Sequence, residues 1–294
     1  MDFTYLRNDR SKVLAFCEKS EQDMKDYFDI LRTWMKKQLH IPSELLSDEF
    51  LEIYVTKNKF SIEKVKTKIE NYCTMKNEPR KKMLLENYSL TPSKEPQFYI
   101  PMPELTDDLY RVFIAKVWDE HKYDMASEHS NLLILREFCS RYDYNLGEIY
   151  ILDLSEISAM QIISKLRVNI LAEGVEMILN AHSARIKEVH IINPIGPTLL
   201  NLVKPFLPSK IGKRLFIHEN ADMVSKLVAA KCLPKDYGGD QKSLKEFLID
   251  LDEVYERNIE NIRQYVNTTA REELRQKVSI SQEMQGTFKK LNID

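Results

Sequence analysis

The sequence predicts an α/β protein in which a small all-helical N-terminal domain precedes a domain with a mixed, mostly parallel sheet. Two observations support this prediction. Apolar residues recur at helical spacing over the first part of the chain, and from residue 110 onward short β-branched or aromatic runs alternate with longer helical patterns. Strands that alternate with helices favour a parallel sheet, and the nearly continuous apolar character of these strands indicates that both faces are covered.

The helical domain is predicted for residues 1–88. Its first long helix has apolar residues at spacings of three and four, at Met24, Tyr27, Phe28, Leu31, Trp34 and Met35. Ser47 and Ser61 each come shortly before an acidic residue and an apolar periodic run, which is typical of helix N-caps. Four prolines then follow close together, at Pro92, Pro96, Pro101 and Pro103. Because proline lacks a backbone donor and fixes φ, this stretch is expected to be an extended connection between two domains.

Four strands are predicted for the sheet, at residues 110–117, 147–154, 187–193 and 213–218. Beyond them, apolar residues at helical spacing from Leu244 to Tyr265 predict one long C-terminal helix, which a tail follows. Together the C-terminal helix and the tail cover residues 243–294.

The composition is that of an ordinary globular protein, with 43% hydrophobic and 30% charged residues and a net charge of -2. Because the chain has no excess of positive charge, no nucleic-acid binding is expected, and an anion would need a local basic cluster. The charged N-terminus and the interrupted apolar runs predict neither a secretory signal nor a membrane span. Four cysteines without a CxxC pair are typical of free thiols in a reducing compartment, which predicts a cytoplasmic protein.

The sequence gives little support for catalysis. Asp153 ends an apolar strand, where catalytic groups gather in parallel sheets, but no GxSxG, Walker A or GxGxxG motif follows any predicted strand. Asp153 is therefore expected to accept backbone N–H groups where the chain leaves the sheet. His182, His190 and His218 match no zinc-binding spacing, so we interpret them as structural histidines. We expect no enzyme activity, no metal and no cofactor.

Three segments resemble the CRAL-TRIO lipid-binding family: IYILDLSEI at 149–157, the stretch 189–220, and LPKDYGG at 233–239. They occur in the order and with the intervals of that family, which includes the α-tocopherol transfer protein and the retinaldehyde-binding protein. The helical segment resembles the domain that precedes CRAL-TRIO modules, and the ending MQGTFKKLNID resembles insect-type members. The resemblance therefore implies a lipid-binding domain over residues 89–242.

The LPKDYGG segment places two of the seven glycines of the chain side by side, directly after Tyr237. The resemblance implies that Pro234 stops the preceding helix and that Gly238 and Gly239 turn the chain at the close of the lipid domain. Paired glycines also permit positive φ and close backbone approach on physical grounds alone.

The resemblance further implies a hydrophobic cavity that the sheet floors and a mobile gate helix closes. The gate is expected at residues 197–206, although an ordinary buried helix is the alternative from the sequence alone. An isoleucine, Ile157, stands where tocopherol-type members carry a tryptophan, which leaves the ligand open. The candidate pocket residues are Leu152, Ile157, Met177, Ile178, Val189, Leu199, Val203 and Phe206.

Five basic residues match the phosphoinositide-binding positions of tocopherol-type members or their neighbours: Arg185, Lys187, Lys210, Lys213 and Arg214. Basic side chains near an anionic leaflet each contribute on the order of 1 kcal/mol, so the cluster predicts transient peripheral membrane binding. Their simplest alternative role is that of solvated residues at strand ends. Glu219 replaces a glycine that is usual in the family and adds an acidic group near the cluster.

These features predict an intracellular, monomeric carrier that moves a small lipid between membranes. The ligand expected from the resemblance is a retinoid, tocopherol, carotenoid or similar isoprenoid, and phosphoinositides assist docking and gate opening. The alternative is a phospholipid- or phosphoinositide-binding sensor or adaptor that does not transfer its ligand. An enzyme that acts on a hydrophobic substrate through Asp153 is the third and least favoured hypothesis.

Overall fold

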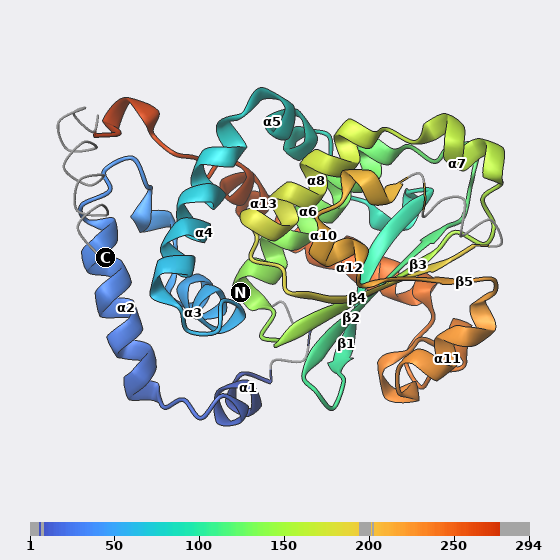
Figure 1. Cartoon of the computed structure of the whole chain (residues 1–294), viewed down its shortest axis with the longest axis horizontal. Coiled ribbons are helices and arrows are strands. Elements are labelled where there is room, and N and C mark those ends of the chain that lie inside the picture. Colours follow the sequence, from blue (N-terminus) through green and yellow to red (C-terminus); the bar gives the residue numbers. More distant parts are fainter. Residues whose placement is uncertain (1–5, 7–8, 194–200, 202, 277–294) are drawn as a thin grey trace, which may run out of the picture.

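The computed structural model describes residues 6, 9–193, 201 and 203–276. In this part of the chain, helices alone make up the N-terminal region, and a five-stranded sheet with its helices makes up the rest (Figure 1). The predicted fold class is therefore confirmed.

The N-terminal region consists of α1 (Arg10–Phe16), α2 (Glu21–Met35), α3 (Asp48–Lys57), α4 (Ile62–Thr74) and α5 (Pro79–Glu86). Ser20 caps α2 with a capping box, and the Ser47 hydroxyl accepts the Phe50 N–H at 3.3 Å at the start of α3. Ser61 is the N-cap of α4, as predicted, but its side chain makes no capping hydrogen bond. The apolar face of α2 buries Met24, Leu31 and Met35, while Tyr27, Phe28 and Trp34 are partly buried against the core.

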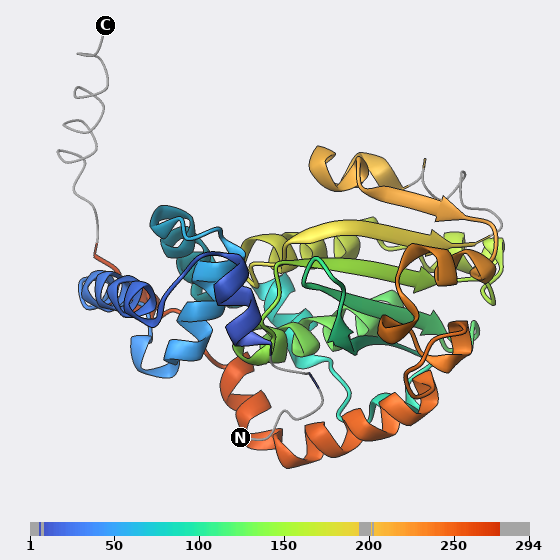
Figure 2. The same cartoon turned by 90° about the horizontal axis from the view of Figure 1, so that it is seen from below.

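The sheet consists of β1 (Gln97–Leu105), β2 (Tyr110–Val117), β3 (Gly147–Asp153), β4 (Ile186–Ile192) and β5 (Leu215–His218), in that spatial order. Strands β2 to β5 run parallel, while β1 pairs with β2 in the antiparallel sense. Figure 2 shows β5 at the edge of the sheet far from β1. The four strands predicted from the sequence are thus present, with ends that differ by no more than a few residues.

Strand β1 corrects the prediction that the proline-rich stretch is an extended connection. Pro101 pairs with Phe113, and the pairing is then interrupted until Leu105. Prolines are tolerated here because β1 is an edge strand, which needs its backbone donors on one side only. The Arg111 guanidinium donates to the carbonyls of Met102 and Pro103 and so replaces part of the interrupted ladder.

The remaining helices surround the sheet. They are α6 (Met125–Tyr142), α7 (Ala159–Lys165), α8 (Val168–Asn180), α10 (Ser209–Gly212), α11 (Val224–Leu227), α12 (Leu244–Arg257) and α13 (Ile259–Val266). Helix α12 runs beside β1, where Tyr255 contacts Phe98 (Figure 2).

The prediction of one long C-terminal helix is wrong, because the chain breaks at Asn258 into α12 and α13. The Asn258 side chain donates to the Val254 carbonyl at 2.8 Å, and the residue has non-helical backbone angles. Asparagine side chains compete with the backbone for such carbonyls, and this competition ends α12 although the apolar spacing continues.

The glycine pair has the structural role expected of it. Gly238 has a φ of 74°, and a side chain at Gly239 would place its Cβ 2.0 Å from the Leu233 carbonyl oxygen. The segment before Pro234 is a short 3-10 turn, Ala230–Cys232, rather than a helix that Pro234 would stop, and a second 3-10 turn, Lys235–Tyr237, leads into the glycines. The turn at the glycines aims Tyr237 at the sheet, where its hydroxyl donates to Asp153 at 2.5 Å.

Candidate ligand cavity and basic groove

A cavity of about 170 Å³ lies between the sheet and helices α6, α7, α8 and α10. Alternate residues of a strand share one face, so Tyr150 and Leu152 of β3 contribute to its floor while Asp153 points to the opposite side. Most of the lining is apolar, and the aliphatic part consists of Leu132, Leu152, Leu154, Ile157, Ile162, Leu166, Leu171, Val175, Ile178, Ile186, Val189, Ile191, Val203, Leu207, Ile211 and Leu215. Such a lining suits a hydrophobic molecule.

The structure brings five of the predicted pocket residues together on this cavity: Leu152, Ile157, Ile178, Val189 and Val203. Met177 is fully buried beside the cavity in α8 but does not line it, and Phe206 is 46% exposed in the turn Lys204–Phe206. Leu199 and half of the expected gate at 197–206, namely residues 197–200 and 202, lie outside the described residues. Contact between these side chains and a ligand stays a prediction.

One part of the cavity wall is polar, and the sequence analysis did not identify it. The hydroxyls of Tyr99 and Tyr123 both donate to the Glu128 carboxylate, each at 2.8 Å. Burial and the nearby Glu128 charge raise the pKa of both tyrosines well above the usual value. We call Tyr99, Tyr123 and Glu128 the polar cluster.

His129 adds a further polar group to the wall. Its Nδ1 lies 3.0 Å from the Met125 carbonyl oxygen, which can only accept, so Nδ1 carries a proton. The ring packs against Gly174 of α8, where an added Cβ would lie 2.1 Å from the His129 Cδ2. The glycine therefore allows α6 and α8 to approach closely at the cavity.

A second hollow, of about 320 Å³, lies between α3, α4 and the segment that carries β4 and α10. We call it the basic groove, and its cationic lining apart from Lys57 consists of Lys59, Lys64, Lys68, Arg185, Lys210 and Arg214. Lys57 also lines the groove, but its ammonium pairs with Glu148 at 3.1 Å. Within the described residues, no acidic side chain forms an ion pair with any of the six cations of the groove.

The positive charges of the groove act on one another. Burial lowers the pKa of Lys210, and the charges of Arg214, Lys59, Arg185 and Lys64 lower it further. An anion that approaches the groove stabilises the charged form of such an ammonium. The basic groove is therefore suited to a multiply charged anion.

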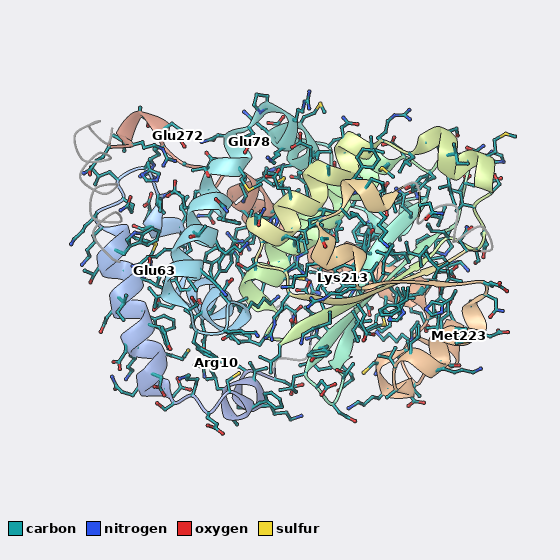
Figure 3. All side chains as sticks on the ribbon, in the orientation of Figure 1. Arg10, Glu63, Glu78, Lys213, Met223 and Glu272 are labelled. Atoms are coloured by element: carbon teal, nitrogen blue, oxygen red, sulfur yellow. The ribbon has the colours of Figure 1, made fainter. Side chains whose placement is uncertain are left out.

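The structure places three of the five predicted basic residues, Arg185, Lys210 and Arg214, in the groove. Lys187 lies in a neighbouring hollow, where its Nζ donates to the Tyr110 hydroxyl at 2.8 Å. Lys213, labelled in Figure 3, directly follows α10, is exposed and does not line the groove.

The sequence analysis missed the three cations that the helical region contributes, Lys59, Lys64 and Lys68. They lie more than a hundred residues from the others in the chain. Only the fold therefore shows that the two sets face one hollow.

The cavity and the basic groove share a wall. Ile186 and Ile211 line both, and Lys210, next to Ile211 in the four-residue helix α10, lines the groove. An anion in the groove would thus lie next to the structural element that closes one side of the apolar cavity.

Asp153 and the histidines have structural contacts, as expected. Asp153 accepts the Ser155 N–H at 3.0 Å and the Tyr237 hydroxyl, and His182 Nε2 lies 2.9 Å from Glu137. His190 Nδ1 and His218 Nε2 lie 3.0 Å apart. Among the described residues, no group of three or more His, Cys, Asp or Glu side chains is placed to hold a metal ion.

Two family models match the chain. The model described as "Pinta-like, UBA domain" matches residues 20–91, and the model described as "CRAL/TRIO domain" matches residues 98–239. The second match contains the cavity, the sheet and the glycine pair. Residues 98–239 therefore match the CRAL-TRIO family, whose members bind small hydrophobic ligands such as lipids.

Among curated relatives, Clavesin-1 from Xenopus laevis is 36% identical over 96 residues, which cover 32% of this chain and 29% of that protein. Clavesin-2 from Mus musculus is 29% identical over 133 residues, which cover 44% of this chain and 40% of that protein. The matched region thus spans less than half the length of these relatives. A solved structure entitled "Crystal structure of Sfh5" has a TM-score of 0.46 and 12% identity, covering 82% of this chain and 99% of that one.

The described helices include none that is long and apolar enough to cross a membrane.

Proposed function

We propose that the protein binds a small lipid in the cavity and carries it between membranes, without converting it chemically. The ligand class expected from the family resemblance is a retinoid, tocopherol, carotenoid or similar isoprenoid. The observation that supports this proposal most strongly is the shared wall, because Ile186 and Ile211 place an apolar cavity next to the basic groove. A protein that delivers a hydrophobic ligand to a membrane needs both features side by side.

The basic groove is proposed to bind the phosphorylated headgroup of a phosphoinositide at the membrane surface. Six cations that form no ion pair with the acidic side chains of the described residues supply the charge, and arginine guanidinium groups bind phosphate in a bidentate manner. Lys187 and Lys213 are proposed to add to this contact from the rim, as their positions in the sequence imply.

Vesicle-to-vesicle transfer of retinol, with and without phosphatidylinositol bisphosphate in the acceptor vesicles, tests the proposal. Reversing the charge of Lys210 and Arg214 together is expected to weaken vesicle binding by at least about 30-fold, since losing each basic residue costs on the order of 1 kcal/mol and the new negative charges add repulsion from the anionic surface. Retinol binding in solution is expected to stay unchanged, because neither side chain lines the cavity. The matched control reverses Lys226 and Lys245, which are exposed and lie outside the groove.

Each outcome separates one hypothesis from another. Equal transfer by both double variants would show that the groove does not bind phosphoinositide during transfer. Retinol binding without transfer would favour the sensor or adaptor hypothesis, and a retinol product in the recovered extract would favour an enzyme. A protein that binds neither retinol nor any lipid from its own tissue would overturn the proposal.

A further inference from the structure

The hydrogen-bonding groups in the cavity wall have an uneven distribution of donors and acceptors. Tyr99 and Tyr123 use their hydroxyl hydrogens on Glu128 at 2.8 Å. As a carboxylate, Glu128 can only accept, and its two oxygens have about four lone-pair directions, of which the tyrosines occupy two. The polar cluster therefore has spare acceptors and no free donor.

The two other polar groups of the wall show the same bias. His129 uses its Nδ1 proton on the Met125 carbonyl at 3.0 Å, so in the neutral ring Nε2 is an acceptor. Tyr150 donates its hydroxyl hydrogen to Glu148 at 3.1 Å, so this hydrogen already has a partner. The polar side chains of the described wall therefore offer a ligand acceptors, while their hydrogen-bond donors already have partners.

We infer that the ligand is a lipid alcohol, an apolar molecule that ends in a hydroxyl group, and that this hydroxyl donates to the Glu128 carboxylate. This inference rests on the proposed function, since it names the ligand class of the same cavity. The polar cluster contributes the anchor and the aliphatic lining contributes the affinity for the hydrocarbon body.

Other head groups fit this wall less well. A carboxylate ligand would bring a second negative charge next to Glu128 at low dielectric. An aldehyde, ketone or ester has no hydrogen to donate and would leave the acceptors of the polar cluster without a partner. An ammonium would pair with Glu128, but burying a second charge costs more free energy than burying a neutral hydroxyl.

A matched ligand series tests the inference with the full chain. Retinol, retinal, retinoic acid and the hydrocarbon analogue without the oxygen differ only at the head group. Cetyl alcohol, palmitaldehyde and palmitic acid repeat the comparison with a flexible chain. The wild-type protein is expected to bind each alcohol about tenfold or more tightly than its partners at neutral pH, because a hydrogen bond to a charged group discriminates by about that factor.

Two variants of Glu128 give a reversal that a general packing defect would not produce. Glu128→Leu removes the acceptor and frees the hydroxyls of Tyr99 and Tyr123 as donors, so aldehyde and acid are expected to gain affinity while the alcohol loses about tenfold. Glu128→Gln keeps the shape and removes the charge, so the discrimination against the acid is expected to disappear. Glu49→Leu, an exposed first-turn glutamate of α3, is the matched control.

The outcomes for the inference and for the proposed function are distinct. If the wild-type protein binds the acid or the hydrocarbon as tightly as the alcohol, or if Glu128→Leu keeps the alcohol preference, the inference is overturned while lipid binding stands. If no member of either series binds, the proposed function fails and the inference fails with it. Loss of alcohol binding with a gain of acid binding in the Glu128 variants supports the inference.

Discussion

Replacing the buried Glu137 by glutamine is expected to destabilise the protein strongly. The carboxylate joins the N-terminal helices to α6, because it accepts from Tyr72 at 2.5 Å and pairs with Lys76 at 2.7 Å. It also pairs with Arg141 at 3.0 Å and lies 2.9 Å from His182. Glu137 and these four partners are all nearly or fully buried.

The magnitude follows from the charges that the substitution leaves behind. Two buried cations, Lys76 and Arg141, lose their shared carboxylate, and breaking a buried pair in this way costs about 3–5 kcal/mol. Burial already lowers the pKa of Lys76 to about 8 although Glu137 is present. Without the carboxylate, the pKa of Lys76 in the folded variant falls further below the pKa of an unfolded lysine. Between these two pKa values the unfolded state binds more protons than the folded state, so the stability of the folded variant rises with pH.

Differential scanning calorimetry of Glu137→Gln and of a control, Glu63→Gln, measures the effect. Glu63, labelled in Figure 3, is an exposed residue of α4. It pairs with Lys66 at 2.7 Å, and its loss is expected to change the Tm within experimental error. Glu137→Gln is expected to lower the Tm by at least about 5 °C at neutral pH, and by less at pH 9. Equal Tm values for the two variants would show that the buried charges are not coupled as the contacts indicate.

Two further predictions concern the glycine pair and the cavity. Gly239→Ala is expected to destabilise the protein more than Gly238→Ala, because the new Cβ at 239 meets a backbone carbonyl, whereas alanine at 238 costs only the strain of positive φ, about 1–2 kcal/mol. Gly212→Ala is the control, because its new Cβ meets only a flexible side chain at 3.5 Å. The order of the three unfolding free energies checks this prediction. Leu152→Trp with Val189→Trp is expected to fill the cavity and abolish lipid in organic extracts of the purified protein, and extracts that match the wild type would place the ligand elsewhere.

The fold was predictable where the chain follows simple patterns. Strands β2 to β5 are short apolar runs because helices cover the parallel part of the sheet, and such runs are visible in one dimension. Strand β1 was missed because its prolines argue against pairing, and only its edge position makes them acceptable. The break at Asn258 was missed because the apolar spacing continues across it.

The site was predictable only in part. The aliphatic pocket residues followed from the family resemblance, and five of them share one cavity. The polar cluster was missed because Tyr99 falls in the misinterpreted strand and its partner Glu128 lies 29 residues away. Nothing in the local sequence links a tyrosine in β1 to a glutamate in the first turn of α6.

Contacts across the chain also hold the two sides of the basic groove in fixed positions. The Tyr54 hydroxyl donates to the Ala181 carbonyl at 2.7 Å, and the Asn58 side chain donates to the Ser183 hydroxyl at 3.2 Å. The buried pair of Lys57 and Glu148 adds a third link between the end of α3 and the sheet. These links join the segment that ends α3 to the loop that leads into β4.

Two cations of the groove, Lys59 and Arg185, closely follow these links in the sequence. Lys59 comes after the linked end of α3, and Arg185 comes after the linked loop, so the distance between the two charges is set by buried bonds rather than by flexible side chains alone. Burial and, after it, the neighbouring positive charges lower the pKa of Lys210, so holding these like charges together costs free energy. The buried links offset that cost during folding, so an anion that enters the groove gains the attraction of all six cations without having to assemble them.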